Sequence, residues 1–544
     1  MSNRKTSSET RVFVREATGL VREFGVIEHF MANLSGVVPL FAPAFTAWFI
    51  WYAVPGGSVT LASIAAFLFG VFGYLTAFAF ICATFPRSGS PYVSQSRILH
   101  PSIAWPAEIM LWLSILSFAA LIPSAYVIQW GLAPGLFVLG RMLGNEALMA
   151  VASWTTTPTG IIVIGTIFLL ISLIPAIMGV RVLLRTFLAP LFALGIIGLL
   201  VSIGVLLSSN TSQFIESLTI YEPNLRFEEL VTIGKELKPD AFVPVTLSIG
   251  TFLAALGMTI GTTNSYWNAW SVGEMRRANS VVRQVVSMVI PGFILMLSVV
   301  IIIELLQGIA GRDPLIALTL IGTLSPERLS TPLFGGGVVT ISIPYILANN
   351  PITVILIMIA IIAAAFTFMP INWLIPTRLL FAWSFDRLIP ARFASVNERF
   401  HTPVFSLIVV FLIVEAWLIL VATTPYLGLV FTVTWVWSAV SVGLTCLACA
   451  LLPLRKEFWE QSPVRKYKIL GIPVATIVGL VGFFYQMNGV YQYAAIPELG
   501  FGAPQAYLLG ASYAVAFALY WIVRAVRARQ GIPIDLAFKT LPPE

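Results

Sequence analysis

Long apolar runs separated by short polar segments follow one another along almost the whole chain. A helix that crosses a membrane needs about 20 mostly apolar residues, and this rule predicts twelve spans. We therefore expect an all-α membrane protein with twelve transmembrane helices. The predicted spans lie at roughly 26–53, 59–84, 104–132, 159–180, 187–207, 243–272, 285–309, 352–383, 403–422, 427–452, 470–490 and 504–525.

Two of the predicted spans are interrupted by short polar segments that contain glycine. The first span is interrupted at 33–39 (Asn-Leu-Ser-Gly-Val-Val-Pro), and the sixth at 257–264 (Gly-Met-Thr-Ile-Gly-Thr-Thr-Asn). A helix in lipid has no water to pair freed backbone groups, so such breaks persist only where they line a protein cavity. Paired breaks of this kind indicate a transporter's binding site at the membrane midplane.

The composition agrees with a membrane protein. Hydrophobic residues make up 58% of the chain and charged residues 10%, with a mean hydropathy of +0.92, whereas soluble domains are about 25% charged. The net charge of +7 does not indicate nucleic-acid binding, because positive charge gathers on one side of membrane proteins. Residues 1–23 lack the apolar core of a cleaved signal peptide.

Cysteine and histidine give no pattern of a metal site. Three cysteines are too few for a disulfide framework. Cys446 and Cys449 have the spacing of a metal pair, but they lie in an apolar run beside small residues, where helix packing is the simpler role. The histidines are His29, His100 and His401. We expect no metal and no organic cofactor.

The placement of positive charge predicts the orientation of the spans. If successive loops alternate between the two sides, six of the 31 Lys and Arg residues fall on one side. The other 25 fall on the side of both termini. Because positive charge concentrates in the cytoplasm, we expect a multi-pass protein of the cell membrane with both termini cytoplasmic. The six are Arg141, Arg226, Lys235, Lys238, Arg312 and Arg328.

Spans one to five and six to ten form two sets, each of which begins with an interrupted span. Because five is odd, equivalent sets would be inverted relative to the membrane. This repeat follows from the breaks and the topology, since the two halves show no residue-level identity. We expect a cytoplasmic segment at 1–25, the first repeat at 26–207, an extracellular loop at 208–242, the second repeat at 243–452, spans eleven and twelve at 453–525 and a cytoplasmic tail at 526–544.

Three passages carry motifs that are specific in combination. Residues 377–390 (Thr-Arg-Leu-Leu-Phe-Ala-Trp-Ser-Phe-Asp-Arg-Leu-Ile-Pro) are followed by Thr402-Pro403, and residues 85–92 read Phe-Pro-Arg-Ser-Gly-Ser-Pro-Tyr. Residues 273–277 read Gly-Glu-Met-Arg-Arg. These passages resemble the amino acid–polyamine–organocation superfamily of transporters, and its amino acid permeases in particular. The resemblance covers about residues 20–455; Ser90 replaces one family glycine, and the usual proline after 273–277 is absent.

This resemblance implies a fold and a class of substrate. The family has the five-plus-five inverted-repeat architecture called the LeuT fold, with discontinuous helices one and six. Substrate lies between helices one, three, six, eight and ten. Members mostly carry amino acids, amines or related organic ions.

In the first break the candidate substrate-binding residues are Asn33, Ser35, Gly36, Val37 and Pro39. The freed N–H groups of a half-helix suit a carboxylate, and its carbonyls suit an ammonium group or a cation. The family usually has Gly-x-Gly here, whereas this chain has a proline, which removes an N–H donor. A simple proline kink in a packed helix is the alternative.

In the sixth span the candidate substrate-binding residues are Thr259, Gly261, Thr262, Thr263 and Asn264. Threonines can also pair with preceding carbonyls of their own helix, so a structural role is the alternative. Tyr266 and Trp267 follow this break and are candidate gate residues, although packing would also explain them. Tyr126 in helix three is a third gate candidate, or else an anchor at the membrane interface.

For coupling, the resemblance suggests a cation between helices one and eight, with Thr367 as the candidate ligand. Some proton-coupled relatives have a lysine in helix five, where this chain has Leu194. Coupling to Na+ or H+, exchange and uniport therefore stay open. Glu415 is a carboxylate deep in span nine, where a charge costs roughly 2.5–3.5 kcal/mol. Either a functional role or a structural contact would explain it.

Charged residues near the predicted cytoplasmic helix ends are candidates for an inner gate of salt bridges, or for a solvated rim. The acidic ones are Glu28, Glu108 and Glu274, and the basic ones are Arg87, Arg97, Arg276, Arg277 and Arg378.

We therefore expect a secondary active transporter that moves an amino acid or related small organic solute by alternating access. Its expected partners are a small-molecule substrate, an amino acid or an amine, and the lipid bilayer, without nucleic acid. A substrate-sensing receptor or a channel on the same scaffold is the alternative. A membrane enzyme would need a group of His, Asp, Glu or Cys within the spans, and apart from Glu415 none lies deep enough. Neither break contains an acidic residue, which favours a neutral amino acid over a polyamine.

Overall fold

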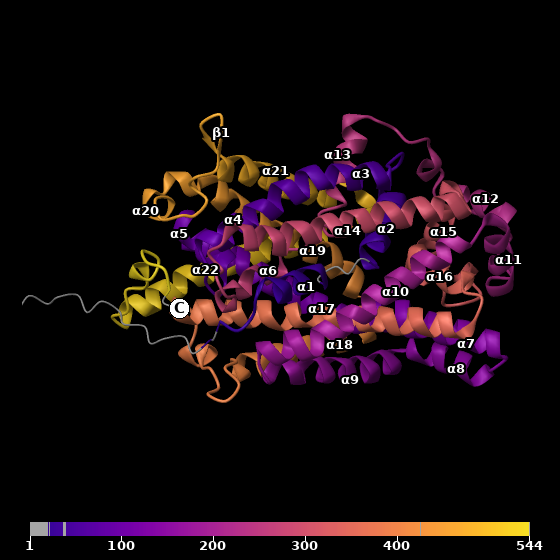
Figure 1. Cartoon of the computed structure of the whole chain (residues 1–544), viewed down its shortest axis with the longest axis horizontal. Helices are drawn as coiled ribbons and strands as arrows, with labels where there is room; N and C mark the ends of the chain where they lie inside the picture. The colour runs from indigo at the N-terminus through magenta and orange to yellow at the C-terminus, as the bar shows by residue number, and fades with distance from the viewer. Residues whose placement is uncertain (1–19, 21, 36–39, 425, 543–544) are drawn as a thin grey trace, which may run out of the picture.

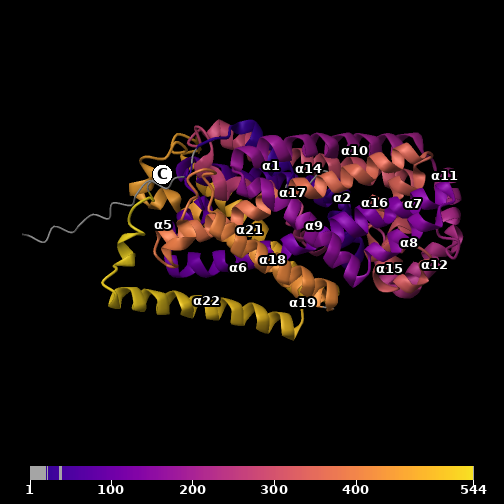
Figure 2. The ribbon, with the colours of Figure 1, turned by 90° about the horizontal axis from the view of Figure 1, so that it is seen from below.

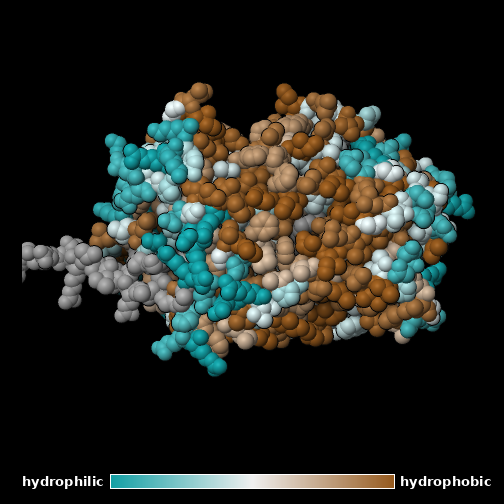
Figure 3. All heavy atoms as spheres, in the orientation of Figure 1, coloured by the Kyte–Doolittle hydropathy of each residue, from teal (hydrophilic) through white to brown (hydrophobic). Residues whose placement is uncertain are grey.

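The computed structural model describes residues 20, 22–35, 40–424 and 426–542, and within these residues the chain is almost entirely helical. The long helices run side by side along the long axis of the molecule (Figure 1). Helix α5 (Ser90–Ile98) lies at the end that also carries the C-terminus, and α12 (Phe227–Leu237) lies at the opposite end. We call these the α5 end and the α12 end. Apolar side chains cover the middle of the face in Figure 3, and polar side chains gather at both ends, as expected for a bundle that crosses a membrane.

Ten helices in the described residues are long and apolar enough to cross a membrane. They coincide with ten of the twelve predicted spans. The first and sixth predicted spans are missing from this set, and these are the two that the sequence interrupts. The ten run over Val59–Thr84, Pro101–Leu143, Pro158–Ile177, Val182–Ser208, Val281–Ala310, Pro351–Phe385, Val404–Thr423, Thr432–Leu454, Val474–Ala495 and Ala503–Arg529.

The sixth span is interrupted as predicted, whereas most of the first predicted break lies outside the described residues. In the first span, α1 (Val26–Ser35) and α2 (Phe41–Ala53) lie on either side of residues 36–39, which are outside the described part of the chain. In the sixth, α13 (Ile249–Gly257) ends at the break, and residues 258–266 are turns and extended chain. The span then resumes as η5 (Trp267–Glu274), a 3-10 helix.

The other spans are continuous, although three of them contain π-helical segments. Such segments change the direction of side chains and are frequent at functional sites. The spans consist of α3 (Val59–Ala66), η1 (Phe67–Leu75) and α4 (Thr76–Thr84); α6 (Pro101–Leu121), η2 (Ile122–Leu132) and α7 (Ala133–Leu143); α9 (Pro158–Ile177); η3 (Val182–Leu188) and α10 (Ala189–Ser208); α14 (Val281–Ala310); α17 (Pro351–Phe385); α18 (Val404–Thr423); α19 (Tyr426–Leu451); α21 (Val474–Ala495); and α22 (Ala503–Arg529).

Local sequence explains where several spans begin. The Asn350 side chain accepts a hydrogen bond from the Thr353 N–H (2.9 Å), and Pro351 takes the first position of α17. Thr157 caps α9 in the same way, with Pro158 next in the chain. A polar cap followed by proline fits a helix start, because the proline lacks an N–H that would have no partner there.

The polar connections that the hydrophobic pattern treats as loops contain further helices. Each of them is shorter than the stretch of about 20 apolar residues that predicts a span. Helix α12, for example, buries Leu230 and Gly234 against α15 and exposes Glu228 and Glu229. The connecting elements are α8 (Glu146–Thr155), α11 (Thr211–Tyr221), α12, α15 (Arg312–Leu324), α16 (Val339–Leu347), α20 (Lys456–Trp459) and the hairpin of β1 (Lys468–Ile469) and β2 (Ile472–Pro473).

The spans that contain α6 and α19 are the most buried of the ten, whereas α22 runs along one edge of the bundle and α10 along the opposite edge (Figure 2). The segment before α1 also pairs with the end of the sixth span. The Arg276 N–H donates to the Phe24 carbonyl (2.8 Å), which joins the two interrupted spans at the α5 end.

A candidate substrate site at the interrupted helices

A small cavity of about 20 Å³ lies beside the break of the sixth span. It is surrounded by five parts of the fold: α2, the third span, the sixth break with η5, α17 and α19. No charged side chain lines it; its walls are aromatic rings, hydroxyls, one amide, one aliphatic side chain and glycine backbone. The lining residues are Phe45, Ser114, Ile115, Phe118, Tyr126, Gly261, Asn264, Trp267, Phe368, Thr434, Trp435 and Ser438.

Gly261 and Asn264 are the residues of the sixth break that line this cavity. The Asn264 amide donates to the Gly261 carbonyl (3.0 Å), which fixes the shape of the turn. Position 261 requires glycine because the ring of Trp435 lies very close to its backbone: an added Cβ would be 2.5 Å from that ring. The absence of a side chain at this position therefore lets α19 approach the break.

The three threonines of the break contact the helices that support it. The Thr46 hydroxyl of α2 donates to the Thr262 hydroxyl (3.0 Å). Thr259 and Thr263 lie within hydrogen-bond distance of the Tyr485 hydroxyl of α21, at 2.8 and 3.0 Å. Each threonine also donates to a carbonyl one turn earlier. These contacts hold the broken backbone in place, as expected for threonines that replace lost helix bonds.

In the first break, Asn33 joins the interrupted spans to each other. Its amide donates to the Ser287 carbonyl (2.8 Å), and its side-chain oxygen accepts from the Asn268 N–H (2.9 Å). The Ser35 hydroxyl is buried and has no partner within the described residues. Gly36, Val37 and Pro39 lie outside the described residues.

Three aromatic rings separate the small cavity from a larger one. Phe45, Phe118 and Tyr126 line both the small cavity and an outer cavity of about 580 Å³. The outer cavity extends toward the α12 end. Its other lining residues are Ala44, Trp48, Phe49, Tyr52, Leu121, Ala125, Gln129, Trp130, Thr323, Gly336, Val338, Thr432, Glu498, Leu499 and Gly500.

Of the predicted gate residues, Tyr126 and Trp267 line the small cavity and Tyr266 does not. Tyr126 lies in η2, with its ring centroid 4.5 Å from those of Phe41 and Trp130. Tyr266 is buried in an aromatic cluster behind the break, with its ring 4.8 Å from that of Trp267. Tyr126 is thus placed between the two cavities, and Tyr266 supports Trp267 from behind.

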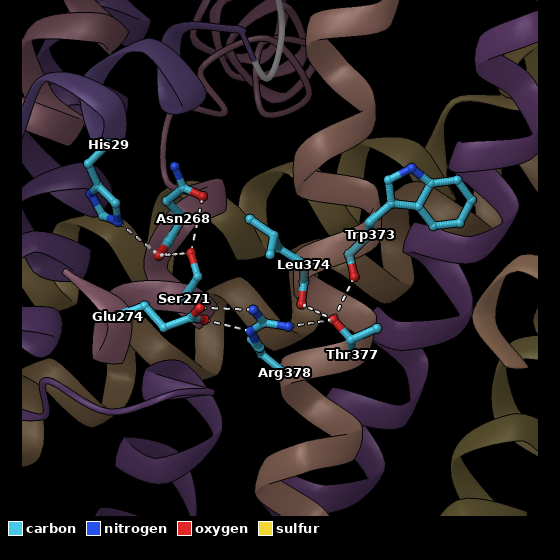
Figure 4. A network of polar contacts seen from close by, with 8 residues as sticks. All are labelled: His29, Asn268, Ser271, Glu274, Trp373, Leu374, Thr377 and Arg378. Carbon is cyan, nitrogen blue, oxygen red and sulfur yellow. Dashed lines mark hydrogen bonds and ion pairs between the residues drawn. The ribbon is translucent and has the colours of Figure 1, made fainter. Parts of the chain in front are cut away.

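At the α5 end, two buried ion pairs close the path below the small cavity. Arg378 of α17 binds Glu274 of η5 through two bonds, Nε–Oε1 at 2.6 Å and Nη2–Oε2 at 2.9 Å (Figure 4). Arg97 of α5 binds Asp386 in the same two-point manner, at 2.7 and 2.8 Å. Two parallel bonds to a carboxylate fix both partners in position, so these pairs tie α5, α17 and η5 together.

The comparison with known proteins agrees with this geometry. The sequence matches the model of the amino acid permease family over residues 30–523. The chain belongs to the amino acid permease family. It is therefore a secondary transporter and a multi-pass membrane protein, not an enzyme, and the predicted superfamily is confirmed. Family membership also favours transport over the receptor or channel alternative.

A solved structure with the same fold is the crystal structure of MhsT in complex with L-phenylalanine. It is 16% identical in sequence, with a TM-score of 0.50, and the match covers 86% of this chain and 99% of that chain. The LeuT fold is thereby shown, whereas an identity this low leaves the ligand a property of MhsT. No curated protein matches the sequence significantly.

Most of the aromatic residues that line the site were not predicted from the sequence, among them Phe45, Phe368 and Trp435. These residues lie in apolar runs that contain many other aromatic residues, so nothing local distinguishes them. Asp386, the partner of Arg97, was also missed among the candidate gate residues. Glu28, which was included, binds Arg185 instead (2.7 Å).

Two further predicted residues lie outside the cavity lining. The Thr367 hydroxyl is buried and donates to the Ala364 carbonyl of its own helix (2.7 Å). Thr367 immediately precedes Phe368, which lines the cavity. Glu415 accepts a hydrogen bond from Thr166. That contact joins α18 to α9, away from the cavity, and supports a structural role for this carboxyl group.

At the α12 end, a salt bridge joins two connecting segments across the mouth of the outer cavity. Lys238 Nζ lies 2.5 Å from Glu498 Oε1 and 5.9 Å from the ring centroid of Tyr52. Burial raises the pKa of Glu498, but the hydrogen bond and the charge of Lys238 lower it by more than burial raises it. The pKa of Glu498 therefore lies below the ordinary 4.5. The pair is therefore formed at neutral pH.

We predict that Glu498→Gln lowers the melting temperature of the purified protein slightly at pH 7, because a partly exposed pair contributes at most about 1 kcal/mol. A lowered pKa means that this stabilisation is complete above pH 4.5 and is lost as the pH falls through the pKa of the folded state. The difference between wild type and variant should thus persist from pH 7 to 5 and shrink as the pH falls below 4.5, through the pKa of the folded state. A difference that stays constant down to strongly acidic pH would contradict the pairing.

Proposed function

We propose that the chain transports a neutral amino acid by alternating access, with the substrate bound at the small cavity beside the sixth break. The observation that carries the proposal is the position of this cavity. Phe45, Phe118 and Tyr126 separate it from the outer cavity, and the Arg378–Glu274 pair closes its other side. A site with a barrier on each side is what alternating access requires.

The chemistry of the lining supports a neutral substrate. No charged side chain faces the cavity, so the substrate's ammonium and carboxylate groups would bind the freed backbone groups at the two breaks. The substrate-binding residues we propose are Asn33, Ser35, Gly36, Val37, Pro39, Thr259, Gly261, Thr262, Thr263 and Asn264. Tyr126, Tyr266 and Trp267 would act as gates. Thr367 would contribute to a cation site if the coupling ion is Na+.

The size of the cavity indicates a closed conformation. About 20 Å³ is room for one or two water-sized probes, so an amino acid can enter only after the aromatic rings move apart. The aromatic walls favour an apolar side chain on the substrate. L-Phenylalanine, the ligand in the MhsT structure, is therefore the first candidate to test.

The topology that we propose has twelve spans, with inverted repeats at 26–207 and 243–452 and two further spans. Both termini would lie in the cytoplasm of the cell, which makes the α5 end the cytoplasmic end. The 25 Lys and Arg residues on the side of the termini support this orientation.

We expect the purified chain in proteoliposomes to take up a radiolabelled neutral amino acid with saturable kinetics. Unlabelled substrate inside the vesicles should stimulate this uptake, because a carrier returns faster when it is loaded. The panel comprises L-phenylalanine, smaller neutral amino acids, charged amino acids and amines, with Na+ and pH gradients imposed separately. Protein-free vesicles are the control. Flux that does not saturate, or uptake of amines alone, would contradict the proposal.

A further inference from the structure

Glu108 of α6 is a fully buried carboxyl group with three neutral hydrogen-bond donors. Gln95 Nε2 lies 2.7 Å and Ser441 Oγ 2.8 Å from its Oε1, and Trp270 Nε1 lies 3.1 Å from its Oε2. These donors belong to α5, α19 and η5. Among the described residues, no basic group lies within salt-bridge distance of Glu108, in contrast to the carboxylates of Glu274 and Asp386.

This carboxyl group lies between the small cavity and the α5 end. Ser114, which lines the cavity, is six residues further along α6, or about 9 Å along the helix axis. Ser441 follows Ser438, another lining residue, by one turn of α19. Trp270 belongs to η5, the half-helix that follows the sixth break. Glu108 therefore contacts the part of the sixth span that has to move if the α5 end is to open.

The other ionisable groups around α6 leave Glu108 without a counter-ion. Tyr266 of the sixth span and Tyr513 of α22 interact with it electrostatically. The two nearby arginines are occupied, Arg97 of α5 by Asp386 and Arg378 of α17 by Glu274. Among the side chains that the structure describes, the remaining ionisable groups on the neighbouring helices α5, α18, α19 and α22 make no hydrogen bond or ion pair with it: Tyr92, Glu415, Cys446, Cys449, Tyr507, Tyr520, Arg524, Arg527 and Arg529.

Both protonation states of Glu108 can be accommodated. A buried carboxylate without a cation is costly, although three donors stabilise it. A protonated carboxyl group needs an acceptor, and the Ser441 hydroxyl, 2.8 Å from Oε1, can donate to the carboxylate and accept from the acid. The Gln95 amide nitrogen also donates to the Ser441 carbonyl (3.1 Å) and the Thr445 hydroxyl (2.9 Å), so it stays in place in both states. A hydrogen bond to the neutral acid is also weaker than one to the carboxylate, so protonation loosens the link to Trp270.

We propose that Glu108 is a proton-binding site that couples proton movement to substrate transport, a role that rests on the proposed transport function. The proton comes from water in the outer cavity when that side is open and binds the carboxylate as substrate binds above it. Protonation weakens the Trp270 bond and frees η5 to move, which opens the α5 end. Proton and substrate then leave on that side, and the carboxylate forms again.

The test uses the full-length chain in proteoliposomes without Na+. The substrate is the amino acid for which the vesicles show counterflow. We expect a pH gradient with the acidic side outside to drive accumulation of this amino acid inside the vesicles. Glu108→Gln, which resembles the protonated state, should retain counterflow at equal pH. Its gradient-driven accumulation of the amino acid should be at least tenfold lower than that of wild type. Glu415→Gln is the matched control, because it removes another carboxyl group within a span, away from the cavity, and this variant should accumulate substrate normally.

A direct measurement of protons complements the transport assay. Adding substrate to wild type in weakly buffered detergent solution should take up protons, measured with a pH-sensitive dye, and Glu108→Gln should bind substrate without this uptake. If Glu108→Gln does not fold, Glu108→Asp should keep proton uptake with a shifted pH midpoint. Normal gradient-driven accumulation by Glu108→Gln, or wild-type counterflow that ignores the pH gradient, would overturn the proton site alone. Absence of counterflow with every amino acid would overturn the transport function as well.

Discussion

Gly261→Ala is expected to lower the initial rate of amino acid uptake about tenfold while the protein still folds. The new Cβ would lie 2.5 and 2.7 Å from two carbons of the Trp435 ring, far inside normal contact. This ring cannot retreat easily, because it is buried and packs against Phe45, Phe118 and Tyr493. Overpacking of this kind costs about 1–3 kcal/mol, and about 1.4 kcal/mol corresponds to a factor of ten. Gly261→Leu should abolish uptake.

The control for Gly261→Ala is Gly204→Ala in α10, where a Cβ meets nothing within 4 Å. This variant should transport at the wild-type rate. Trp435→Phe combined with Gly261→Ala should recover part of the uptake, because the smaller ring relieves the collision. Uptake is measured in proteoliposomes and folding by thermal unfolding in detergent. Wild-type kinetics for Gly261→Ala would show that substrate does not bind beside Gly261.

The hydrophobic pattern predicted the spans well because membrane insertion depends on a property that can be read locally. Twenty apolar residues in a row are visible without knowledge of the neighbours, and so is a polar interruption such as that around Gly261. The helices α8, α11, α12, α15 and α16 were not predicted. Each is shorter than the twenty apolar residues that the rule requires, and each packs on neighbouring helices, as Gly234 of α12 packs on Ala317 of α15.

The candidate site was predicted only in part, for a similar reason. Gly261, Asn264, Tyr126 and Trp267 carry a local signal, because they are polar, flexible or follow a break, and they do line the cavity. The threonines carry the same signal, but tertiary contacts direct their hydroxyls to neighbouring helices. Trp435 gives no local signal at all, since its role comes from the approach of α19 to a glycine in another span.

Arg378→Met is expected to destabilise the protein by about 3–5 kcal/mol, because it leaves the Glu274 carboxylate buried without a partner. Both side chains are almost fully buried, with 1% and 3% of their surfaces exposed. The unpaired carboxylate regains water if η5 moves away from α17, so the variant should also favour conformations open at the α5 end. We expect a lower melting temperature and strongly reduced concentrative uptake. Arg226→Met is the control, because its pair with Glu229 is exposed at 3.9 Å and such pairs contribute little.

A second substitution separates the role of the Arg378–Glu274 pair in stability from its role in closure. In Arg378→Met with Glu274→Gln no unpaired buried charge is left at this position, so the melting temperature should rise most of the way back to that of wild type. Closure at the α5 end should not return, because an amide and a thioether do not replace two charge-assisted bonds. A cysteine introduced by Ser271→Cys, at a buried position of η5, should therefore react faster with a membrane-permeant maleimide in the double variant than in the wild-type background. The native cysteines are buried and give a low background. If stability and slow labelling both return, the pair serves the fold and does not close the path.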